Sequence, residues 1–196
     1  MRIVAGSLKG RKLAPVPDKG VRPTSDRLRE SLFNILQHHG WLPVTDLEAD
    51  DTEPGRRRSV VLDAFCGTGA LALEALSRGV DRAIMMDRHG PTLGTARDNA
   101  AMLGVSDRCR FIRADATKPP PASEPAALCF LDPPYGKGLA LPALLALTAK
   151  GWLAPDAICV IEAHARDPID LPPEFEPLDN RRLGETRVVI ARRMQG

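Results

Sequence analysis

The fold is decided by one stretch, Val60-Val61-Leu62-Asp63-Ala64-Phe65-Cys66-Gly67-Thr68-Gly69-Ala70-Leu71-Ala72. Its first three residues are an apolar run typical of a strand that is covered on both faces. Gly67 and Gly69 allow a tight turn in which backbone N–H groups approach a ligand closely. A helix that starts near Ala70 directs further unpaired amides at the same space. The stretch therefore predicts a strand, a glycine turn and a helix start beside a ligand.

Strand and helix patterns alternate downstream of this stretch. We expect helices at 69–78, 91–103 and 139–150, and strands at 83–86, 109–113, 126–131 and 157–161. Two further strand-like pieces, 175–183 and 186–191, are separated by a glycine and predict an antiparallel hairpin at the edge of the sheet. Alternating elements imply a mainly parallel sheet with helices on both faces.

The N-terminal third lies outside this alternation. Residues 2–5 and 11–14 predict a small hairpin, and Thr24 or Ser25 can cap a helix that runs to about His38. We divide the chain into an N-terminal extension of hairpin and helix, residues 1–40, an inserted loop, residues 41–58, and a main domain, residues 59–196. The three parts are expected to form one compact unit, with the inserted loop on its surface.

Composition narrows the functional class. The chain has 196 residues, of which 43% are hydrophobic and 27% charged, as in an ordinary globular domain. No membrane span or signal peptide is recognisable, so a cytoplasmic protein without membrane association is expected. The four cysteines are scattered and no histidine stands at metal spacing, so no metal is expected. Cys66 could be read as a nucleophile, but no base is spaced to activate it.

The net charge of +2 is unevenly distributed. Residues 1–30 carry +5 and residues 181–196 carry +4, so the middle of the chain carries −7. Basic ends on an acidic centre indicate contact with a polyanion, although solvated termini would have the same composition. The candidate contacts to a polyanion such as RNA are Arg2, Lys9, Arg11, Lys12 and Arg27.

Carboxylates follow the ends of five predicted strands, at Asp63, Asp87, Asp115, Asp132 and Glu162. Ligands bind at this edge in open α/β sheets. Asp87 follows Gly67 by 20 residues, where an acid accepts hydrogen bonds from ribose hydroxyls. Asp115 could accept from an adenine amine, or could merely cap a helix. Asp63 would repel a pyrophosphate but suits a cofactor with a cationic amine or sulfonium, such as S-adenosylmethionine.

The stretch Leu131-Asp132-Pro133-Pro134-Tyr135 points to the reaction. Its two prolines lack N–H donors and fix φ, so Pro133 presents its carbonyl rigidly. That carbonyl and the Asp132 carboxylate are two acceptors beside the flat ring of Tyr135. They can hold the amine of a stacked base and aim its lone pair at an electrophile, which favours methyl transfer to nitrogen. A proline turn without function is the alternative.

These residues resemble a known family. The segment Asp63–Gly69 followed by Asp132-Pro133-Pro134-Tyr135 resembles class I S-adenosylmethionine-dependent methyltransferases that modify amino groups. Residues 2–6, 10–13 and 22–36 resemble, more narrowly, the bacterial 16S ribosomal RNA guanine-966 N2-methyltransferases. The resemblance implies a Rossmann-like α/β fold with a seven-stranded, mostly parallel sheet and an antiparallel C-terminal strand. Tyr135 stands where some relatives carry phenylalanine.

The resemblance also implies which residues form the site. Catalysis would fall to Asp132, Pro133, Pro134 and Tyr135. S-adenosylmethionine would be bound by Asp63, Phe65, Gly67, Gly69, Asp87 and Asp115, with Arg22 and Thr24 near the cofactor or the entering base.

We therefore expect a monomeric enzyme that methylates N2 of a guanine in 16S ribosomal RNA, within a 30S subunit or its assembly intermediate. Methylation of adenine N6 in DNA or of a protein glutamine is the alternative with the same chemistry, although the first usually needs a separate recognition domain. A non-catalytic RNA-binding assembly factor and a nicotinamide oxidoreductase are the alternatives from other classes.

Overall fold

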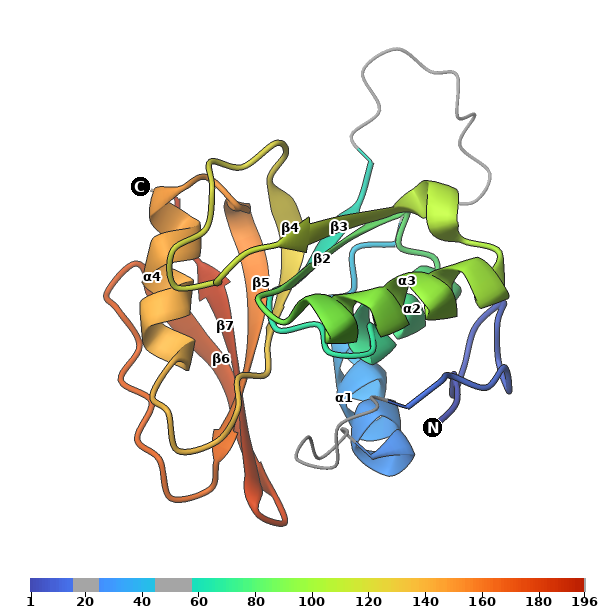
Figure 1. Cartoon of the computed structure of the whole chain (residues 1–196). Helices are drawn as coiled ribbons and strands as arrows, with labels where there is room; N and C mark the ends of the chain where they lie inside the picture. The colour runs from blue at the N-terminus through green and yellow to red at the C-terminus, as the bar shows by residue number, and fades with distance from the viewer. Residues whose placement is uncertain (16–24, 45–57, 196) are drawn as a thin grey trace.

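A seven-stranded sheet forms the centre of the computed structural model, which describes residues 1–15, 25–44 and 58–195 (Figure 1). The strand order is β3-β2-β1-β4-β5-β7-β6. The strands are β1 (Val60–Asp63), β2 (Arg82–Asp87), β3 (Cys109–Arg113), β4 (Ala126–Leu131), β5 (Leu153–His164), β6 (Phe175–Leu183) and β7 (Thr186–Arg193). Strands β1 to β5 pair in parallel, whereas β7 runs antiparallel to β5 and to β6. The predicted sheet, with its antiparallel C-terminal strand, is confirmed.

The order of the strands creates a crevice beside β1. The chain moves from β1 outward through β2 to β3, and then returns to place β4 on the other side of β1. Val61 pairs with Leu128 and Asp63 with Phe130, so the carboxyl ends of β1 and β4 lie next to each other. A reversal of this kind leaves room for a ligand outside the carboxyl ends of the strands.

Helices cover both faces of the sheet unequally (Figure 1). One apolar layer joins the N-terminal segment with α1 (Asp26–His38), α2 (Ala70–Ser77) and α3 (Gly90–Leu103). The other layer holds α4 (Ala140–Ala149) and parts of the connecting loops. Successive strand residues alternate between the layers, so Phe130 faces α1 to α3 and Leu131 faces α4. A short 3₁₀ turn, η1 (Ser106–Arg108), precedes β3.

The predicted N-terminal hairpin is present, but the prediction that its two arms are regular strands is wrong. Only one bridge, between Arg2 and Lys12, joins them within the described residues, supported by Ile3 N donating to Arg11 O at 2.9 Å. The physical reason lies on α2. The Glu74 carboxylate accepts from the N–H groups of Val4 and Ala5 at 2.9 and 3.0 Å, so the arm pairs with a helix side chain instead of its neighbour.

A buried ion cluster fastens α1 and the hairpin to α2. Glu74 accepts from Arg78 Nε at 2.8 Å and lies 3.6 Å from Arg29 Nε, and all three side chains are buried. Ser25 caps α1, because its hydroxyl accepts from Leu28 N at 3.2 Å. The N-terminal extension therefore packs directly on the helix that follows the glycine turn.

Other sequence-based boundaries hold within a few residues. The main exception is β5, which extends to Leu153–His164 where only 157–161 was predicted. Most of the inserted loop, and the candidate residues Arg22 and Thr24, lie outside the described residues. Among the described helices, none has the length and apolar character needed to cross a bilayer.

Candidate active site at the carboxyl edge of the sheet

The backbone conformation of the turn at Gly67–Gly69 requires glycine and leaves space beside it. Gly67 and Gly69 have φ of 53° and 79°, and Gly69 N donates to Cys66 O at 2.7 Å. A Cβ at Gly69 would lie 2.9 Å from Met85 Sδ, so both φ and packing favour glycine there. A Cβ at Gly67 would meet no atom within 4 Å. The space beside Gly67 is therefore open, and its use by a ligand stays a prediction.

Asp63 is buried at the end of β1 and is only partly satisfied. Its Oδ2 accepts from Ala72 N at 3.3 Å, whereas Oδ1 has no partner among the described residues. Burial, reinforced by the nearby carboxylates of Asp132 and Asp87 and opposed by the hydrogen bond from Ala72 N, raises the pKa of Asp63 to about 8. A buried acceptor without a donor, beside a helix N-terminus, fits the cationic amine of a cofactor.

Asp87 and Asp115 also lie at the carboxyl edge, but both have local partners. Asp87 accepts from Gly67 N at 3.1 Å and from His89 N at 2.8 Å, which ties β2 to the glycine turn. Asp115 Oδ1 accepts from the Thr117 hydroxyl at 2.7 Å and from Thr117 N at 2.9 Å, and these bonds lower its pKa. Asp115 thus caps its own turn, and its contact with an adenine stays a prediction. Phe65 packs against the α4 layer.

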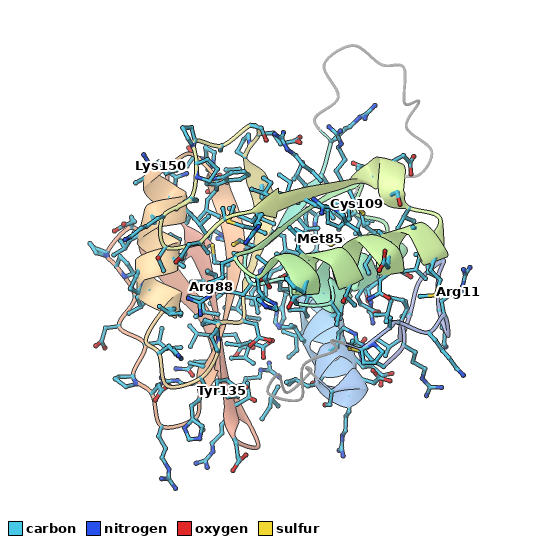
Figure 2. All side chains as sticks on the ribbon, in the orientation of Figure 1. Arg11, Met85, Arg88, Cys109, Tyr135 and Lys150 are labelled. Carbon is cyan, nitrogen blue, oxygen red and sulfur yellow. The ribbon has the colours of Figure 1, made fainter. Side chains whose placement is uncertain are left out.

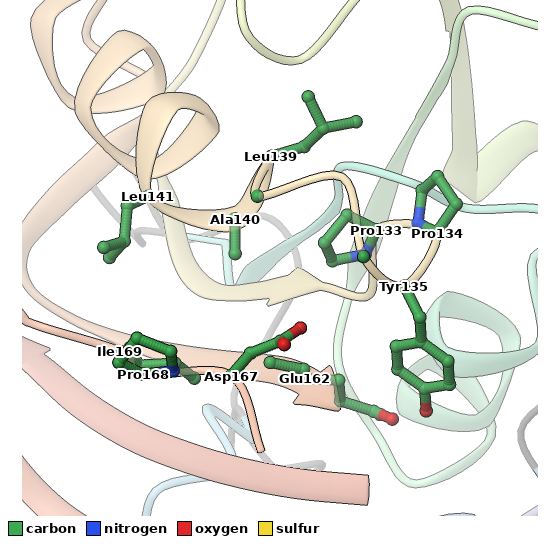
Figure 3. Close-up of a pocket in the computed structure, with 13 residues that line it drawn as sticks. Pro133, Pro134, Tyr135, Leu139, Ala140, Leu141, Glu162, Asp167, Pro168 and Ile169 are labelled. Carbon is green, nitrogen blue, oxygen red and sulfur yellow. The ribbon is translucent and has the colours of Figure 1, made fainter. Parts of the chain in front are cut away.

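The Asp132–Tyr135 segment follows β4 directly, and its last three residues, Pro133, Pro134 and Tyr135, line a pocket (Figure 3). Pro133 is buried, while the Tyr135 side chain is 41% exposed. The Tyr135 hydroxyl lies 2.9 Å from Thr186 Oγ1, and its ring meets His164 edge-on at 6.1 Å. Residues of β5 and β7 therefore hold the tyrosine ring, which the sequence alone did not indicate.

A fifth carboxylate, Glu162, lines the same pocket from the end of β5. Its side chain is buried and Oε1 has no partner among the described residues. Burial raises the pKa of Glu162 well above the usual value, and Asp132 and Asp63 reinforce the shift. The predicted gathering of acids at this edge is thus present for Asp63, Asp132 and Glu162, which interact electrostatically.

The surroundings of Cys66 disfavour its use as a nucleophile. The Cys66 side chain is buried, and burial together with Asp63 and Asp87 raises the pKa of its thiol well above the usual value. Such a thiol is a weak nucleophile. Within residues 1–15, 25–44 and 58–195, no group of three histidine, cysteine or acidic side chains is arranged to hold a metal ion.

The predicted RNA contacts lie on the N-terminal extension. Arg2, Lys9, Arg11, Lys12 and Arg27 are exposed. However, the hairpin turn packs on Ser77 at the end of α2, and Arg11 Nη2 donates to Met102 O at 2.6 Å near the end of α3. Since α2 begins at the glycine turn, its eight residues separate the hairpin turn from the site by about 12 Å. Figure 2 shows Arg11 well apart from Tyr135.

Four arginines that the sequence analysis did not select lie nearer the pocket. They belong to the connection after β5 and to the β6–β7 hairpin, namely Arg166, Arg181, Arg182 and Arg187. Strand β6 ends and β7 begins at the edge where His164 pairs with Thr186, beside Tyr135. The excess positive charge of residues 181–196 was the signal that could have identified all of them except Arg166.

Known proteins match this chain over most of its length. The family model described as "Conserved hypothetical protein 95" matches residues 1–192. "Ribosomal RNA small subunit methyltransferase D" of Escherichia coli K12 is 36% identical over 175 residues, covering 85% of this chain and 76% of that protein. The Haemophilus influenzae protein of the same name is 31% identical, covering 94% and 89%.

Solved structures agree with the fold. The Escherichia coli protein yhhF superimposes with a TM-score of 0.78 and 29% identity, covering 99% of this chain and 98% of that one. An RNA methyltransferase from Salinibacter ruber, in complex with S-adenosyl-L-homocysteine, has a TM-score of 0.61 at 17% identity, covering 89% and 95%. The second likeness concerns the fold alone, which is that of the Rossmann-like methyltransferases.

Proposed function

Because the chain belongs to the family of small-subunit ribosomal RNA methyltransferase D, we propose that it transfers a methyl group from S-adenosylmethionine to the exocyclic N2 of a guanine in 16S ribosomal RNA. The observation that carries this proposal is the position of the Asp132–Tyr135 segment. It follows β4 at the switch point of the sheet, beside the open glycine turn that follows β1. Amine and methyl donor would therefore meet at one edge.

The glycine turn and its carboxylates are the proposed cofactor site. Asp63 Oδ1 offers an unpaired buried acceptor for the amine of S-adenosylmethionine, and Asp87 at the end of β2 would accept from the ribose. Gly67 leaves the space that a side chain would occupy. The Salinibacter ruber neighbour was solved with the demethylated form of this cofactor, which supports the choice. When bound, the cofactor supplies an electrophilic methyl carbon on a sulfonium.

Asp132 and Pro133 would position the target amine. The carbonyl of Pro133 and the carboxylate of Asp132 accept the two N–H bonds of the amine, which draws the nitrogen lone pair out of conjugation and aims it at the methyl carbon. Transfer would form the C–N bond as the sulfur–carbon bond of the cofactor breaks, and the methylated nitrogen would then release one proton to water. Asp132 stabilises the positive charge that develops, and Tyr135, held by Thr186, offers a face on which the base stacks.

Ribosomal RNA is the proposed partner, in a 30S subunit or an assembly intermediate. The base must leave its stack to enter the pocket, at a cost of a few kcal/mol. Exposed arginines and lysines on the N-terminal extension and near the β6–β7 hairpin would contact flanking phosphates. Such a substrate implies that the protein acts in the cytoplasm, and we propose that it does so as a monomer.

Incorporation of labelled methyl groups tests the proposal. Purified protein, labelled S-adenosylmethionine and separate RNA, DNA and protein fractions should give label in RNA alone, recovered as N2-methylguanosine. Label in DNA or in protein would instead favour adenine N6 or glutamine as the acceptor. Binding of RNA without any transfer would favour the assembly factor.

A further inference from the structure

Glu162 is a buried acid for which the proposed reaction gives no task. Its side chain is 2% exposed, and Oε1 has no hydrogen-bond partner within the described part of the chain. The residue lies at the carboxyl end of β5 and lines the pocket that Pro133 and Tyr135 also line (Figure 3). Keeping such a group away from water costs stability, so a structural role does not explain it.

The strand registers place Glu162 beside Asp132. Leu131 of β4 pairs with Ile161 of β5, so the next residue on each strand is Asp132 and Glu162 respectively. Phe130 and Val160, two residues earlier, both belong to the layer that faces α1 to α3. The alternation of side chains therefore directs Glu162 to that same side of the sheet, and Asp132 is near enough to interact with it electrostatically. Neighbouring parallel strands are about 4.8 Å apart, so the two carboxyl groups project from adjacent strand ends.

Tyr135 borders the same position from the other side. Glu162 pairs with Val188 of β7, and the next pair on that face is His164 with Thr186. The Tyr135 hydroxyl is bound to Thr186 and its ring contacts His164, so the aromatic ring stands one residue pair beyond Glu162. A base that stacks on Tyr135 would have one edge facing both acids.

Resting on the proposed function, we propose that Glu162 is the specificity residue for guanine, accepting the N1–H of the base beside the amine that Asp132 and Pro133 hold. In guanine, N1–H is the neighbour of the N2 amine, and O6 follows it on the same edge. The unpaired Oε1 would accept from N1–H. Crowding by Asp132 and Asp63 favours the protonated acid, whose O–H could donate to O6.

The same arrangement disfavours other bases. Adenine offers a bare N1 acceptor next to its amine and has no O6, so a buried acceptor oxygen at this position would be left unpaired. Sites that hydrogen-bond a substrate N–H reject analogues that lack it far more strongly than apolar pockets reject a change in size. Selection of guanine would thus explain why Glu162 is kept buried although its burial lowers stability.

The test combines one substituted base with two variants of the full-length enzyme. RNA substrates carry either guanosine or 2-aminopurine ribonucleoside at the methylated position, because 2-aminopurine keeps the exocyclic amine but lacks N1–H and O6. We compare kcat/KM of the wild type, Glu162→Met and Glu162→Gln on both substrates, with Glu176→Gln on the exposed β6 edge as control.

The wild type should prefer guanosine by about 10- to 100-fold. Glu162→Met should lose most of this preference, to about threefold or less, through slower use of guanosine alone. Glu162→Gln should keep it, since an amide both accepts from N1–H and donates to O6. Thermal unfolding supplies a second readout: Glu162→Met should melt higher than the wild type, because a buried unpaired acid is removed.

Two results would count against this role, and they differ from a failure of the proposed function. An unchanged preference in Glu162→Met, or a lower melting temperature with equal loss on both substrates, would overturn the inference while N2 transfer by the wild type stands. Absence of N2 transfer by the wild type itself would overturn the proposed function and the inference together.

Discussion

Asp63 lies buried at the end of β1 with one oxygen bonded to Ala72 N and the other without a partner among the described residues. A buried carboxylate oxygen without a hydrogen bond destabilises the fold, and this one lies where a cationic amine would be bound. A cofactor that completes the hydrogen bonds of Asp63 would stabilise both the acid and the glycine turn beside it. The residue is therefore a direct point at which to test the cofactor site.

Stability should depend on pH through Asp63. Burial raises its pKa from 3.8 to about 8, so between these values the folded protein holds a proton that the unfolded chain has released. Unfolding becomes easier as pH rises through this window. We expect the melting temperature of Asp63→Asn, which stays neutral, to exceed that of the wild type increasingly from about pH 5 to about pH 8. Parallel curves, matching those of the exposed control Asp98→Asn, would contradict this explanation.

Asp132 is expected to act on transfer and not on cofactor binding. Asp132→Ala removes one of the two proposed acceptors for the amine, so we predict a fall in kcat of at least about 100-fold. Affinity for S-adenosylmethionine, measured by calorimetry, should change less than about threefold. The exposed acid Asp107 supplies the matched control, Asp107→Ala. Retained turnover in Asp132→Ala would remove Asp132 from the mechanism.

At the scale of the elements, α2 organises the N-terminal extension. Its Glu74 bonds the backbone of the hairpin and the arginines of α1 and α2 in one buried cluster. We predict that Glu74→Gln lowers the free energy of unfolding by about 3–5 kcal/mol, because the buried Arg78 guanidinium loses the carboxylate it pairs with and Arg29, which also pairs with Asp26, loses one of its carboxylate partners. Chemical denaturation measures this.

A surface ion pair provides the comparison for Glu74. Arg82 and Glu124 are partly exposed and 3.6 Å apart, so Glu124→Gln should cost no more than about 1 kcal/mol. Equal effects of the two substitutions would mean that the buried cluster does not anchor the hairpin and α1.

The predictable parts of the fold are those with local signals. Apolar runs and bounding glycines located most strands and helices, and the Gly67–Gly69 turn and the acids of the strand ends could be identified from spacing. The irregular form of the N-terminal hairpin could not be predicted, because the N–H groups of Val4 and Ala5 pair with Glu74, about 70 residues away. The partners of Tyr135 and the missing hydrogen bond of Glu162 Oε1 could not be predicted either, since both depend on how β7 packs beside β5. Pairing across the sheet is invisible to periodicity.

At the scale of the whole molecule, basic residues occupy two separate regions around the acidic centre. The hairpin carries one group, and the β6–β7 hairpin carries the other near the pocket. Both groups are proposed to contact the phosphates that flank a target base in the pocket. RNA held in this way should bind with a steep dependence on salt.

Salt dependence tests the hairpin as an RNA contact. We expect Lys12→Glu to weaken RNA binding and to reduce the slope of log K against log salt by about 0.7 to 1. Lys150→Glu reverses an exposed lysine on the far side of the molecule, after α4, and should leave the slope unchanged (Figure 2). Identical slopes for the two variants would show that RNA does not reach the hairpin.

The central claim is that a guanine amine is held between Asp132 and the carbonyl of Pro133 at the carboxyl edge of the sheet. Mass spectrometry of nucleosides from total 16S ribosomal RNA tests it most directly, in a strain that lacks the gene and carries either the wild-type or the Asp132→Ala protein. We expect one N2-methylguanosine that is missing in the deletion strain, that the wild-type protein restores and that Asp132→Ala does not restore. An unchanged N2-methylguanosine content on deletion, or full restoration by Asp132→Ala, would contradict it.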